Sequence, residues 1–249
     1  MNNKLNDKTE ILTLNINNIT MNQLIEQLMD VLEAEDKKKL IYTPNSEIAV
    51  KAFDDPNFSK ILNEADYLVP DGAGLLLAAK ILDKPLQERV AGFDIMQKLL
   101  KEIADKDISV YFLGGKPGII DLAVENIKEA LPKIIIKGFH HGYLDQSSKE
   151  KVIEEINIKE PDILLVGMGV PLQEKFLNSN FDKLNIKIGL TVGGSFDVIA
   201  GEAKRAPIWM QKIYLEWFYR LLQEPKRVGR MMALPRFLLL IFKERFNIK

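Results

Sequence analysis

The chain has 249 residues, of which 47% are hydrophobic, and its formal net charge is −1. This composition is typical of a folded protein with a sizeable core and excludes an intrinsically disordered chain. Because the sequence contains no cysteine, it excludes a disulfide framework and cysteine-ligated metals. We see no secretion signal and no apolar run of the ~20 residues that a spanning helix needs, so we expect a cytoplasmic location.

The predicted elements alternate along the chain. Periodicity and turn residues predict strands over 11–14, 39–43, 67–69, 108–113, 134–137, 161–166 and 186–192. Helical spacing predicts helices over 21–32, 47–53, 57–63, 75–82, 119–131 and 149–158. This order predicts an α/β protein with a Rossmann-like, mostly parallel sheet and helices on both faces.

Asp71 follows the strand 67–69 directly and precedes a turn that contains Gly72 and Gly74. Ligands of open α/β sheets bind at the carboxyl ends of the strands, and glycines allow another molecule to approach the backbone. Asp71 is therefore a candidate general base at the floor of a cleft. The plainer interpretation is a turn or cap residue that accepts the first amides of the next helix.

Thr43 and Asn45 also follow the end of a predicted strand. One of Asn45 and Ser46 fits the cap of the next helix, and the alternative is hydrogen bonding to a sugar or amide. Arg89 is the only arginine before the tail. Its planar guanidinium suits recognition of a carboxylate or phosphate, and a structural ion pair explains it equally well.

Glycine turns follow three further predicted strands. Their residues are Gly114 and Gly115, Gly167 and Gly169, and Gly193 and Gly194. Together with Asp71 they place four special turns on one edge of a parallel sheet, which indicates a nucleotide-sized ligand. The adjacent His140 and His141 are not spaced for a common metal, and we expect them in a loop.

The tail has a different composition from the body. Residues 201–249 contain eleven Lys or Arg and four Asp or Glu, whereas the preceding 200 residues are acidic overall. One helical face is predicted from Trp209, Ile213, Trp217, Phe218 and Leu221. This pattern fits a helical subdomain packed on the core or across a dimer, and equally an amphipathic surface that lies in a membrane interface. The acidic body argues against nucleic-acid binding.

The motifs, taken together, resemble the WecG/TagA/CpsF family of bacterial glycosyltransferases, in order from about residue 40 to the tail. They are Thr43-Pro44-Asn45, Pro70-Asp71-Gly72-Ala73-Gly74, Arg89-Val90-Ala91-Gly92, Phe112-Leu113-Gly114-Gly115, Gly167-Met168-Gly169-Val170-Pro171-Leu172-Gln173-Glu174 and Val192-Gly193-Gly194-Ser195-Phe196-Asp197. The basic tail is most similar to that of the TagA branch, which acts in wall teichoic acid synthesis. Family members transfer N-acetylmannosamine, or its uronic acid in the WecG branch, from a UDP donor to N-acetylglucosamine linked through diphosphate to undecaprenol.

The resemblance also implies roles for single residues. Asp71 matches the proposed catalytic base, which would deprotonate the acceptor 4-hydroxyl for an inverting attack. Sugar-binding positions match Thr43, Asn45, Arg89 and Gln173. UDP-binding positions match Gly114, Gly115, Gly167, Gly169, Gly193, Gly194 and Asp197. Tail arginines that would neutralise the leaving diphosphate match Arg220, Arg227 and Arg230.

The family's domain limits and the change in composition predict a catalytic domain over 1–197 and a membrane-associating appendage over 198–249. A cut after Asp197 is expected to leave a folded but nearly inactive protein. We expect no metal cofactor, because no strand-terminal Asp-x-Asp is present and Asp54-Asp55 fits a helix boundary. The predicted location is the inner face of the cell membrane, with a lipid-linked acceptor as partner and the oligomeric state left open.

Other classes of function stay open from the sequence alone. A nicotinamide-dependent oxidoreductase should place an acidic residue about 20 positions after its glycine turn, at the end of the next strand. The strand after Gly115 instead ends at Lys137-Gly138. A peripheral membrane adaptor would use the glycine turns only for packing. No single residue separates an N-acetylmannosamine donor from its uronic acid.

Overall fold

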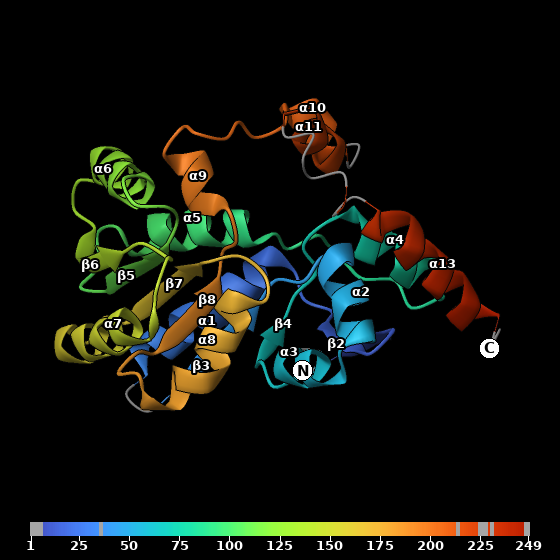
Figure 1. Cartoon of the computed structure of the whole chain (residues 1–249), viewed down its shortest axis with the longest axis horizontal. Coiled ribbons are helices and arrows are strands. Elements are labelled where there is room, and N and C mark those ends of the chain that lie inside the picture. The colour runs from blue at the N-terminus through green and yellow to red at the C-terminus, as the bar shows by residue number, and fades with distance from the viewer. Residues whose placement is uncertain (1–6, 35–36, 213–214, 224–228, 230–231, 247–249) are drawn as a thin grey trace.

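The computed structural model describes residues 7–34, 37–212, 215–223, 229 and 232–246 (Figure 1). Its centre is a sheet of six parallel strands in the order β4-β3-β8-β7-β5-β6. The strands are β3 (Lys39–Tyr42), β4 (Tyr67–Leu68), β5 (Ser109–Gly114), β6 (Ile135–His140), β7 (Ile163–Gly167) and β8 (Ile188–Thr191). The predicted α/β fold with a parallel sheet is confirmed. The expectation that His140 lies in a loop was wrong, because His140 pairs with Leu113 at the end of β6.

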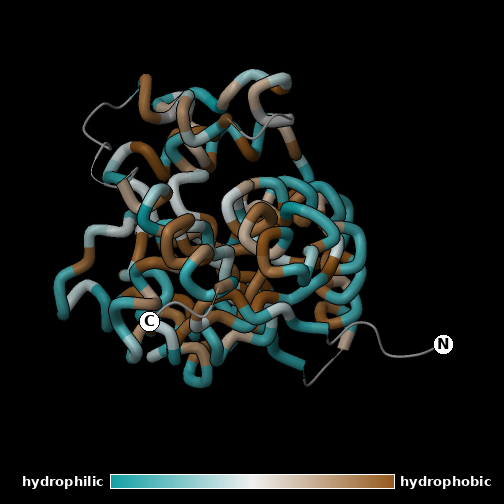
Figure 2. The backbone as a smooth tube through the Cα atoms, turned by 90° about the vertical axis from the view of Figure 1, so that its right-hand side faces the viewer, coloured by the Kyte–Doolittle hydropathy of each residue, from teal (hydrophilic) through white to brown (hydrophobic). Residues whose placement is uncertain are grey.

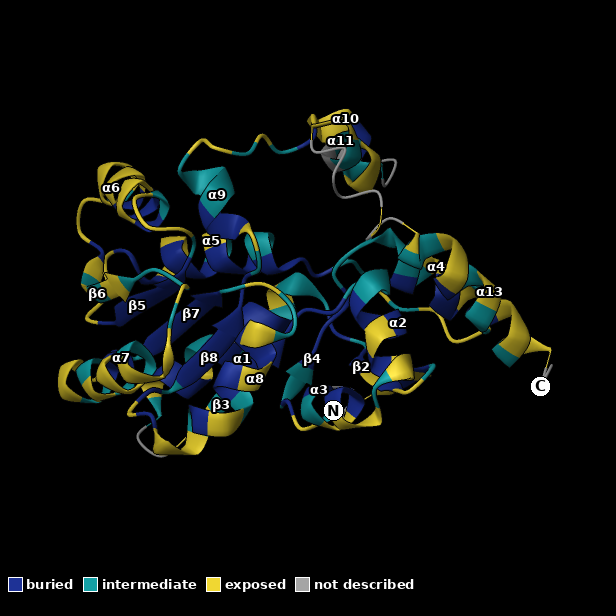
Figure 3. Cartoon of the chain, viewed as in Figure 1, coloured by how far each residue is buried: buried dark blue, intermediate teal, exposed yellow. Residues whose placement is uncertain are grey.

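Helices cover both faces of the sheet, which explains why its central strands are apolar without interruption. All residues of β5, β7 and β8 are buried (Figure 3). Along β7, Leu164 and Val166 pack into one hydrophobic cluster, whereas Ile163 and Leu165 pack into the other. This alternation follows from the period of two in a strand, so each face of the sheet has its own core.

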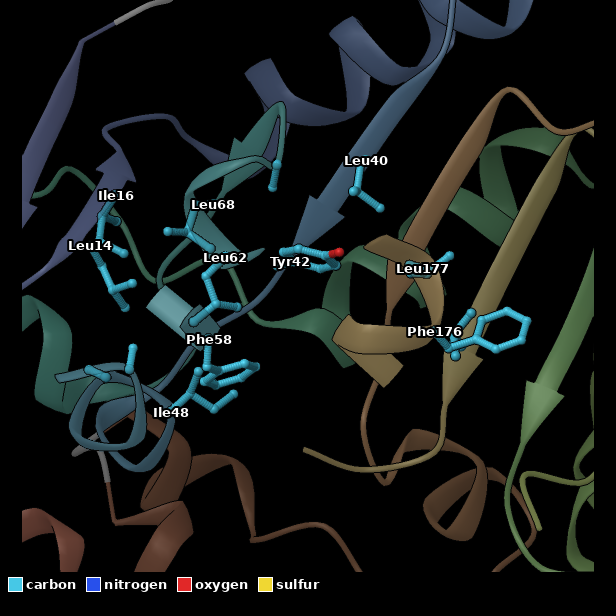
Figure 4. Packing of buried hydrophobic residues seen from close by; sticks show 14 of the residues in the cluster. Leu14, Ile16, Leu40, Tyr42, Ile48, Phe58, Leu62, Leu68, Phe176 and Leu177 are labelled. Carbon is cyan, nitrogen blue, oxygen red and sulfur yellow. The ribbon is translucent and has the colours of Figure 1, made fainter. Parts of the chain in front are cut away.

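The first core, shown in part in Figure 4, lies under helices of both halves of the chain. These helices are α2 (Ser46–Asp54), α3 (Pro56–Asn63), α4 (Ala73–Ile81), α7 (Gln146–Lys159), α8 (Leu172–Asn180) and α13 (Ala233–Arg245), and the short η2 (Phe181–Lys183) follows α8. The second core lies under α1 (Met21–Glu33), α5 (Gly92–Ile103), α6 (Ile119–Ala130) and α9 (Ser195–Ile199). Hydrophobic segments gather inside the molecule and hydrophilic segments outside (Figure 2).

The N-terminal segment is a hairpin and not the single strand predicted over 11–14. β1 (Lys8–Ile11) pairs antiparallel with β2 (Leu14–Asn17). The chain turns at Leu12 and Thr13, where Leu12 has a φ of 55°. Buried Ile11, Leu14 and Ile16 face the first core, so the apolar residues that suggested one strand belong to both arms.

The C-terminal segment contributes three described helices. An extended stretch leads from α9 to α10 (Ile208–Lys212) and α11 (Glu216–Gln223), which lie at the top of Figure 1. The predicted continuous apolar face is therefore divided between two short helices, and Ile213 lies outside the described residues. No described helix has both the length and the apolar character needed to cross a membrane.

The last helix, α13, packs on the body beside α2 and α4 (Figure 1). Its Phe237 and Ile241 are completely buried in the first core. On its exposed side, Arg236 pairs with Asp54 through two contacts of 2.6 Å. The division into a catalytic domain over 1–197 and an appendage over 198–249 stays a prediction. The segment 198–249 includes α13, whose buried residues belong to the core of the body.

Candidate active site

Two neighbouring strand ends bring Asp71 and Asn45 together. Beyond the end of β4, the Val69 amide donates to the Tyr42 carbonyl at 3.0 Å, and the Asp71 amide donates to the Pro44 carbonyl at 2.8 Å. The two chains thus run on side by side after the strands end. This parallel course explains why polar residues about 25 positions apart in the sequence share one edge of the sheet.

A cavity of about 1100 Å³ opens above these strand ends. Asn45, Asp71 and Arg89 all line it, so the structure brings three of the predicted site residues together. Its other lining residues are Ser46, Glu47, Gly72, Ala73, Gly74, Leu76, Leu77, Lys80, Asp83, Pro85, Leu86, Gln87, Ala91, Phe93, Arg205, Glu216, Trp217, Leu234 and Leu238. They come from α2, α4, α5, α11 and α13, from the loops before α4 and α5, and from the segment between α9 and α10, so the cavity joins the body to the C-terminal helices.

The Asp71 carboxylate contacts both a cation and a backbone amide. One oxygen lies 3.5 Å from the Arg89 guanidinium, and the other accepts from the Gly92 amide at 3.3 Å. Gly92 is the first residue of α5, whereas α4 begins after Gly72 without any side-chain cap. The plainer interpretation named a turn or a cap residue. Asp71 does lie in the turn between β4 and α4, but the cap on α4 was wrong, and the carboxylate accepts from the start of α5 instead.

Asp71 belongs to a chain of alternating charges. Arg89 lies 2.9 Å from Glu216 of α11, and Glu216 lies 3.4 Å from Arg205. Arg205 makes two contacts with Asp94, of 2.6 and 2.9 Å. Burial lowers the pKa of Arg205, but the hydrogen bonds and charges of Asp94 and Glu216 outweigh burial and raise this pKa above its ordinary value. The C-terminal segment thus reaches the predicted base through paired charges.

Sequence reasoning missed three members of this chain, Asp94, Arg205 and Glu216. Their contacts with the body join Arg205 to Asp94 across 111 positions and Glu216 to Arg89 across 127 positions, so no local spacing points to these contacts. The only signal was the change to a basic composition near residue 201. Arg205 also stacks on Phe93, with its guanidinium carbon 4.7 Å from the ring centroid, a contact that favours arginine over lysine.

Asn45 and Thr43 serve the local structure as well. Asn45 is the cap of α2, where its side chain accepts from the Ile48 amide at 3.0 Å. It also lines the cavity, so its role as a helix cap is compatible with the predicted hydrogen bonding to a sugar or amide. The Thr43 side chain is buried, and its hydroxyl donates to the Thr191 carbonyl at 3.3 Å. Thr43 therefore lies beneath the cavity and not among its lining residues.

The glycine turns divide into packed and open positions. A Cβ on Gly114 would lie 2.3 Å from the Gly167 carbonyl oxygen, and one on Gly167 would lie 2.6 Å from the Gly193 carbonyl oxygen. The turns thus pack backbone against backbone. In contrast, no described atom lies within 4 Å of a Cβ built on Gly169 or Gly193, whose φ values are 78° and 54°. These two positions leave space for a ligand, whereas Gly114 and Gly167 are glycines for packing.

The other residues predicted to bind the nucleotide lie on the same sheet edge, outside the cavity lining. The Gly115 amide donates to the Gly167 carbonyl at 3.0 Å. A Cβ on Gly194 would lie 3.4 Å from the Asp197 carboxylate, so this carboxylate stands over the turn after β8. The structure groups these residues, and their role in binding UDP stays a prediction.

Gln173 and Glu174 lie in the first turn of α8 and are both buried, with 2% and 1% of their surface exposed. The Gln173 amide nitrogen donates to the Glu174 carboxyl at 2.8 Å. Burial raises the pKa of Glu174 to about 7, although this hydrogen bond acts in the opposite direction. Gln173 does not line the cavity, so the structure places it apart from the other predicted sugar-binding residues. Sequence reasoning missed Glu174, because an acid in a first turn is usually exposed.

Stability should therefore depend on the protonation of Glu174. Its unfolded pKa is near 4.5 and its folded pKa is about 7. Between these two pH values Glu174 loses its proton in the unfolded chain but keeps it in the folded chain. The contribution of Glu174 to the free energy of unfolding is therefore complete below pH 4.5 and is lost as the pH rises to 7. The loss is about 3 kcal/mol. The free energy of unfolding is measured in urea at pH 5 and at pH 8. Between these two pH values it should fall less for Glu174→Gln than for the wild type. Glu154 is exposed, so Glu154→Gln should show the same fall in unfolding free energy as the wild type. An equal fall in both variants would contradict a role of Glu174 in the pH dependence of stability.

The predicted tail arginines lie wholly or partly outside the description. Arg227 and Arg230 lie outside the described residues. The backbone of Arg220 belongs to α11, but its side chain is outside the description. Their predicted role at the diphosphate stays a prediction.

Comparisons with known proteins converge on one group. The profile of the "Glycosyl transferase WecG/TagA/CpsF family" matches residues 9–249. The chain is 35% identical over 216 residues to a protein of Bacillus spizizenii, covering 86% of this chain and 83% of the relative. It is 35% identical over 233 residues to a Bacillus subtilis protein, covering 92% and 90%. A Staphylococcus aureus relative is 33% identical over 243 residues, covering 97% and 95%. All three are named N-acetylglucosaminyldiphosphoundecaprenol N-acetyl-beta-D-mannosaminyltransferase.

Proposed function

The chain belongs to the WecG/TagA/CpsF family of glycosyl transferases, and we propose that it transfers N-acetylmannosamine to a lipid-linked acceptor in teichoic acid synthesis. The proposed donor is UDP-N-acetylmannosamine, and the acceptor is N-acetylglucosamine linked through diphosphate to undecaprenol. The observation that carries the proposal is the Asp71 carboxylate in a large cavity beside Arg89. A carboxylate base and an arginine in one cavity are groups that this chemistry needs.

In the proposed reaction Asp71 accepts the proton of the acceptor 4-hydroxyl. The acceptor oxygen then forms a bond to the anomeric carbon of the donor, and the bond from that carbon to the UDP oxygen breaks. Attack opposite the leaving group inverts the configuration of this carbon. The proton stays on Asp71, and UDP leaves as an anion. Asn45, which also lines the cavity, is placed to hydrogen-bond a sugar hydroxyl or acetamido group.

Negative charge develops on the diphosphate as it leaves. Arg89 and Arg205 line the cavity, where they are held by Asp71, Glu216 and Asp94. Their guanidinium groups are proposed to bind oxygens of the leaving diphosphate, which guanidinium can contact in a bidentate manner. Arg220, Arg227 and Arg230 are proposed to add to this charge. The open turns at Gly169 and Gly193, with Asp197 nearby, are proposed to hold the UDP moiety at the neighbouring strand ends.

We further propose that this charge replaces a metal ion. Among the described residues, no three histidine, aspartate or glutamate side chains are grouped so that they could hold a metal. If arginines take the place of a metal as proposed, turnover should be unchanged when EDTA is added. A loss of activity in EDTA that Mg²⁺ or Mn²⁺ restores would contradict metal independence.

The proposed acceptor stays in a membrane, so the enzyme must reach the bilayer surface. The described parts of α10 and α11 expose large apolar side chains, namely Trp209, Trp217, Phe218 and Leu222. Aromatic side chains on a basic segment favour the interface of an anionic membrane. We therefore propose that the chain works as a peripheral protein on the inner face of the cell membrane, with α10 and α11 toward the lipid.

Release of UDP tests the proposed function directly. The purified full-length chain is mixed with UDP-N-acetylmannosamine and a lipid-diphosphate-N-acetylglucosamine analogue, and UDP is measured over time. We expect release that requires the acceptor, with a disaccharide product detected by mass spectrometry. The same assay with the uronic acid donor should be slower. The absence of UDP release with every lipid-linked acceptor would overturn the proposal.

A further inference from the structure

The cavity has a polar end and an apolar end. The polar end consists of Asn45, Asp71, Arg89, Arg205 and Glu216, described above. The apolar end is a groove formed by Ala73, Leu76, Leu77, Pro85, Leu86, Trp217, Leu234 and Leu238. The polar residues Ser46, Glu47, Lys80, Asp83 and Gln87 also line the cavity. A sugar and its diphosphate are polar throughout, so the proposed reaction at Asp71 leaves the apolar end without a use.

The groove lies between two helices that present matching faces. On α4, the lining residues Ala73, Leu76, Leu77 and Lys80 have the spacing of one helical face. On α13, Leu234 and Leu238 are one turn apart and face them. A Cβ built on Gly74 would lie 3.5 Å from a methyl carbon of Leu234, so the two helices approach closely near Asp71.

The groove begins at the reacting end and continues away from it. From Ala73 to Lys80 the rise along α4 is roughly 10 Å. Leu77 is 47% exposed although it lines the cavity, so an apolar side chain is held open toward this space. Lys80 stands at the far end of the face and is exposed, as is expected where a groove meets an anionic lipid surface.

We propose that this groove, between α4 and α13, binds the first isoprene units of the lipid-linked acceptor. The inference rests on the proposed function, because an acceptor linked through diphosphate to a polyprenol carries a polar head and an apolar chain in this order. The acceptor sugar lies at Asp71, its own diphosphate lies between this sugar and the groove, and the chain leaves along Leu77 and Leu238. The groove thus selects for a polyprenyl chain and orients the acceptor hydroxyl toward the base.

The test compares two soluble acceptors without detergent or membrane, N-acetylglucosamine diphosphate carrying either one isoprene unit or a farnesyl chain. For the wild type, we expect the farnesyl acceptor to have a KM about 10-fold lower, since burial of isoprene carbons adds to binding. Leu77→Asn and Leu238→Asn should each bring the ratio of the two KM values close to one. Leu239→Asn is the matched control, because Leu239 is 58% exposed and is not among the lining residues.

Leu238 also packs against the core, so its variant needs a thermal unfolding control, whereas the half-exposed Leu77 can be replaced at little cost to folding.

Binding of farnesyl diphosphate, measured by calorimetry, separates the proposed groove from the proposed function. One outcome is that the wild type binds farnesyl diphosphate tightly, with both Leu77→Asn and Leu238→Asn weakening this binding about 10-fold, and yet releases no UDP in the transfer assay. That result would overturn the proposed function and keep the groove. A wild type that binds farnesyl and isopentenyl diphosphate equally, or variants that keep the wild-type KM ratio, would overturn the groove.

Discussion

Replacement of Asp71 by asparagine should reduce kcat by on the order of 10²- to 10⁴-fold, which is the usual contribution of a general base. Asparagine has nearly the same shape, and its side-chain oxygen can still accept from the Gly92 amide that Asp71 contacts at 3.3 Å. Arg89 keeps a carboxylate partner, Glu216 at 2.9 Å. The variant therefore removes the proton acceptor and leaves the local packing in place. Release of UDP from saturating donor and acceptor measures the effect.

Asp94→Asn is the control for a loss of charge. Asp94 belongs to the same chain of ion pairs, but it contacts Arg205 and does not line the cavity. We expect its kcat to fall by less than about 10-fold, because no proton transfer depends on it. Thermal unfolding of both variants would show that each is folded. If Asp71→Asn and Asp94→Asn lost activity equally, the role of Asp71 would be electrostatic, and the base would lie elsewhere.

The position of Asp71 could be predicted from the sequence because parallel strands end on one edge of a sheet. Asn45 and Asp71 each follow an apolar strand, and this pattern was enough to predict that they lie close together. Arg89 was marked by its chemistry, as the only arginine in an otherwise lysine-rich body. What these residues share is a local signal, either a strand end or a residue type, that does not depend on distant parts of the chain.

The contacts with the C-terminal segment could not be predicted in this way. Glu216 reaches Arg89 across 127 positions, and the sequence around Glu216 shows only an amphipathic helix. Pattern alone also cannot separate a glycine that admits a ligand from one that permits packing. Gly114 and Gly169 both follow apolar strands, but Gly114 meets the backbone of the next turn and Gly169 faces open space. Such differences depend on the three-dimensional packing of several loops.

The hairpin at the N-terminus shows a different limit. The apolar residues of 11–14 fitted one short strand, whereas the chain reverses at Leu12 in a left-handed conformation. Leucine rarely adopts a positive φ, so nothing in the residue type marked the turn. The conformation is maintained by its surroundings, where the Leu12 amide donates to the Glu244 carboxylate of α13 at 3.1 Å. A contact across 232 positions thus helps to fix a turn of two residues.

Replacement of Phe237 by alanine should lower the free energy of unfolding by about 3–5 kcal/mol, the usual cost of removing a buried aromatic ring from a core. Phe237 is completely buried in the first core, although it belongs to the segment that composition separates from the body. Phe242 on the same helix is 48% exposed, so Phe242→Ala should change stability by only about 0.5 kcal/mol. Urea unfolding of the two variants beside the wild type measures the difference.

The same burial changes the expected result of truncation. A cut after Asp197 removes Phe237 and Ile241 from the core and exposes the apolar faces of α2 and α4 beneath them. Since a domain of this kind is stable by only about 5–15 kcal/mol, we now expect the truncated chain to be strongly destabilised as well as inactive. Phe237→Ala, assayed at a temperature where it is folded, should retain activity, because Phe237 does not line the cavity. A truncated chain that unfolds at the wild-type urea midpoint would show that α13 adds nothing to the stability of the body.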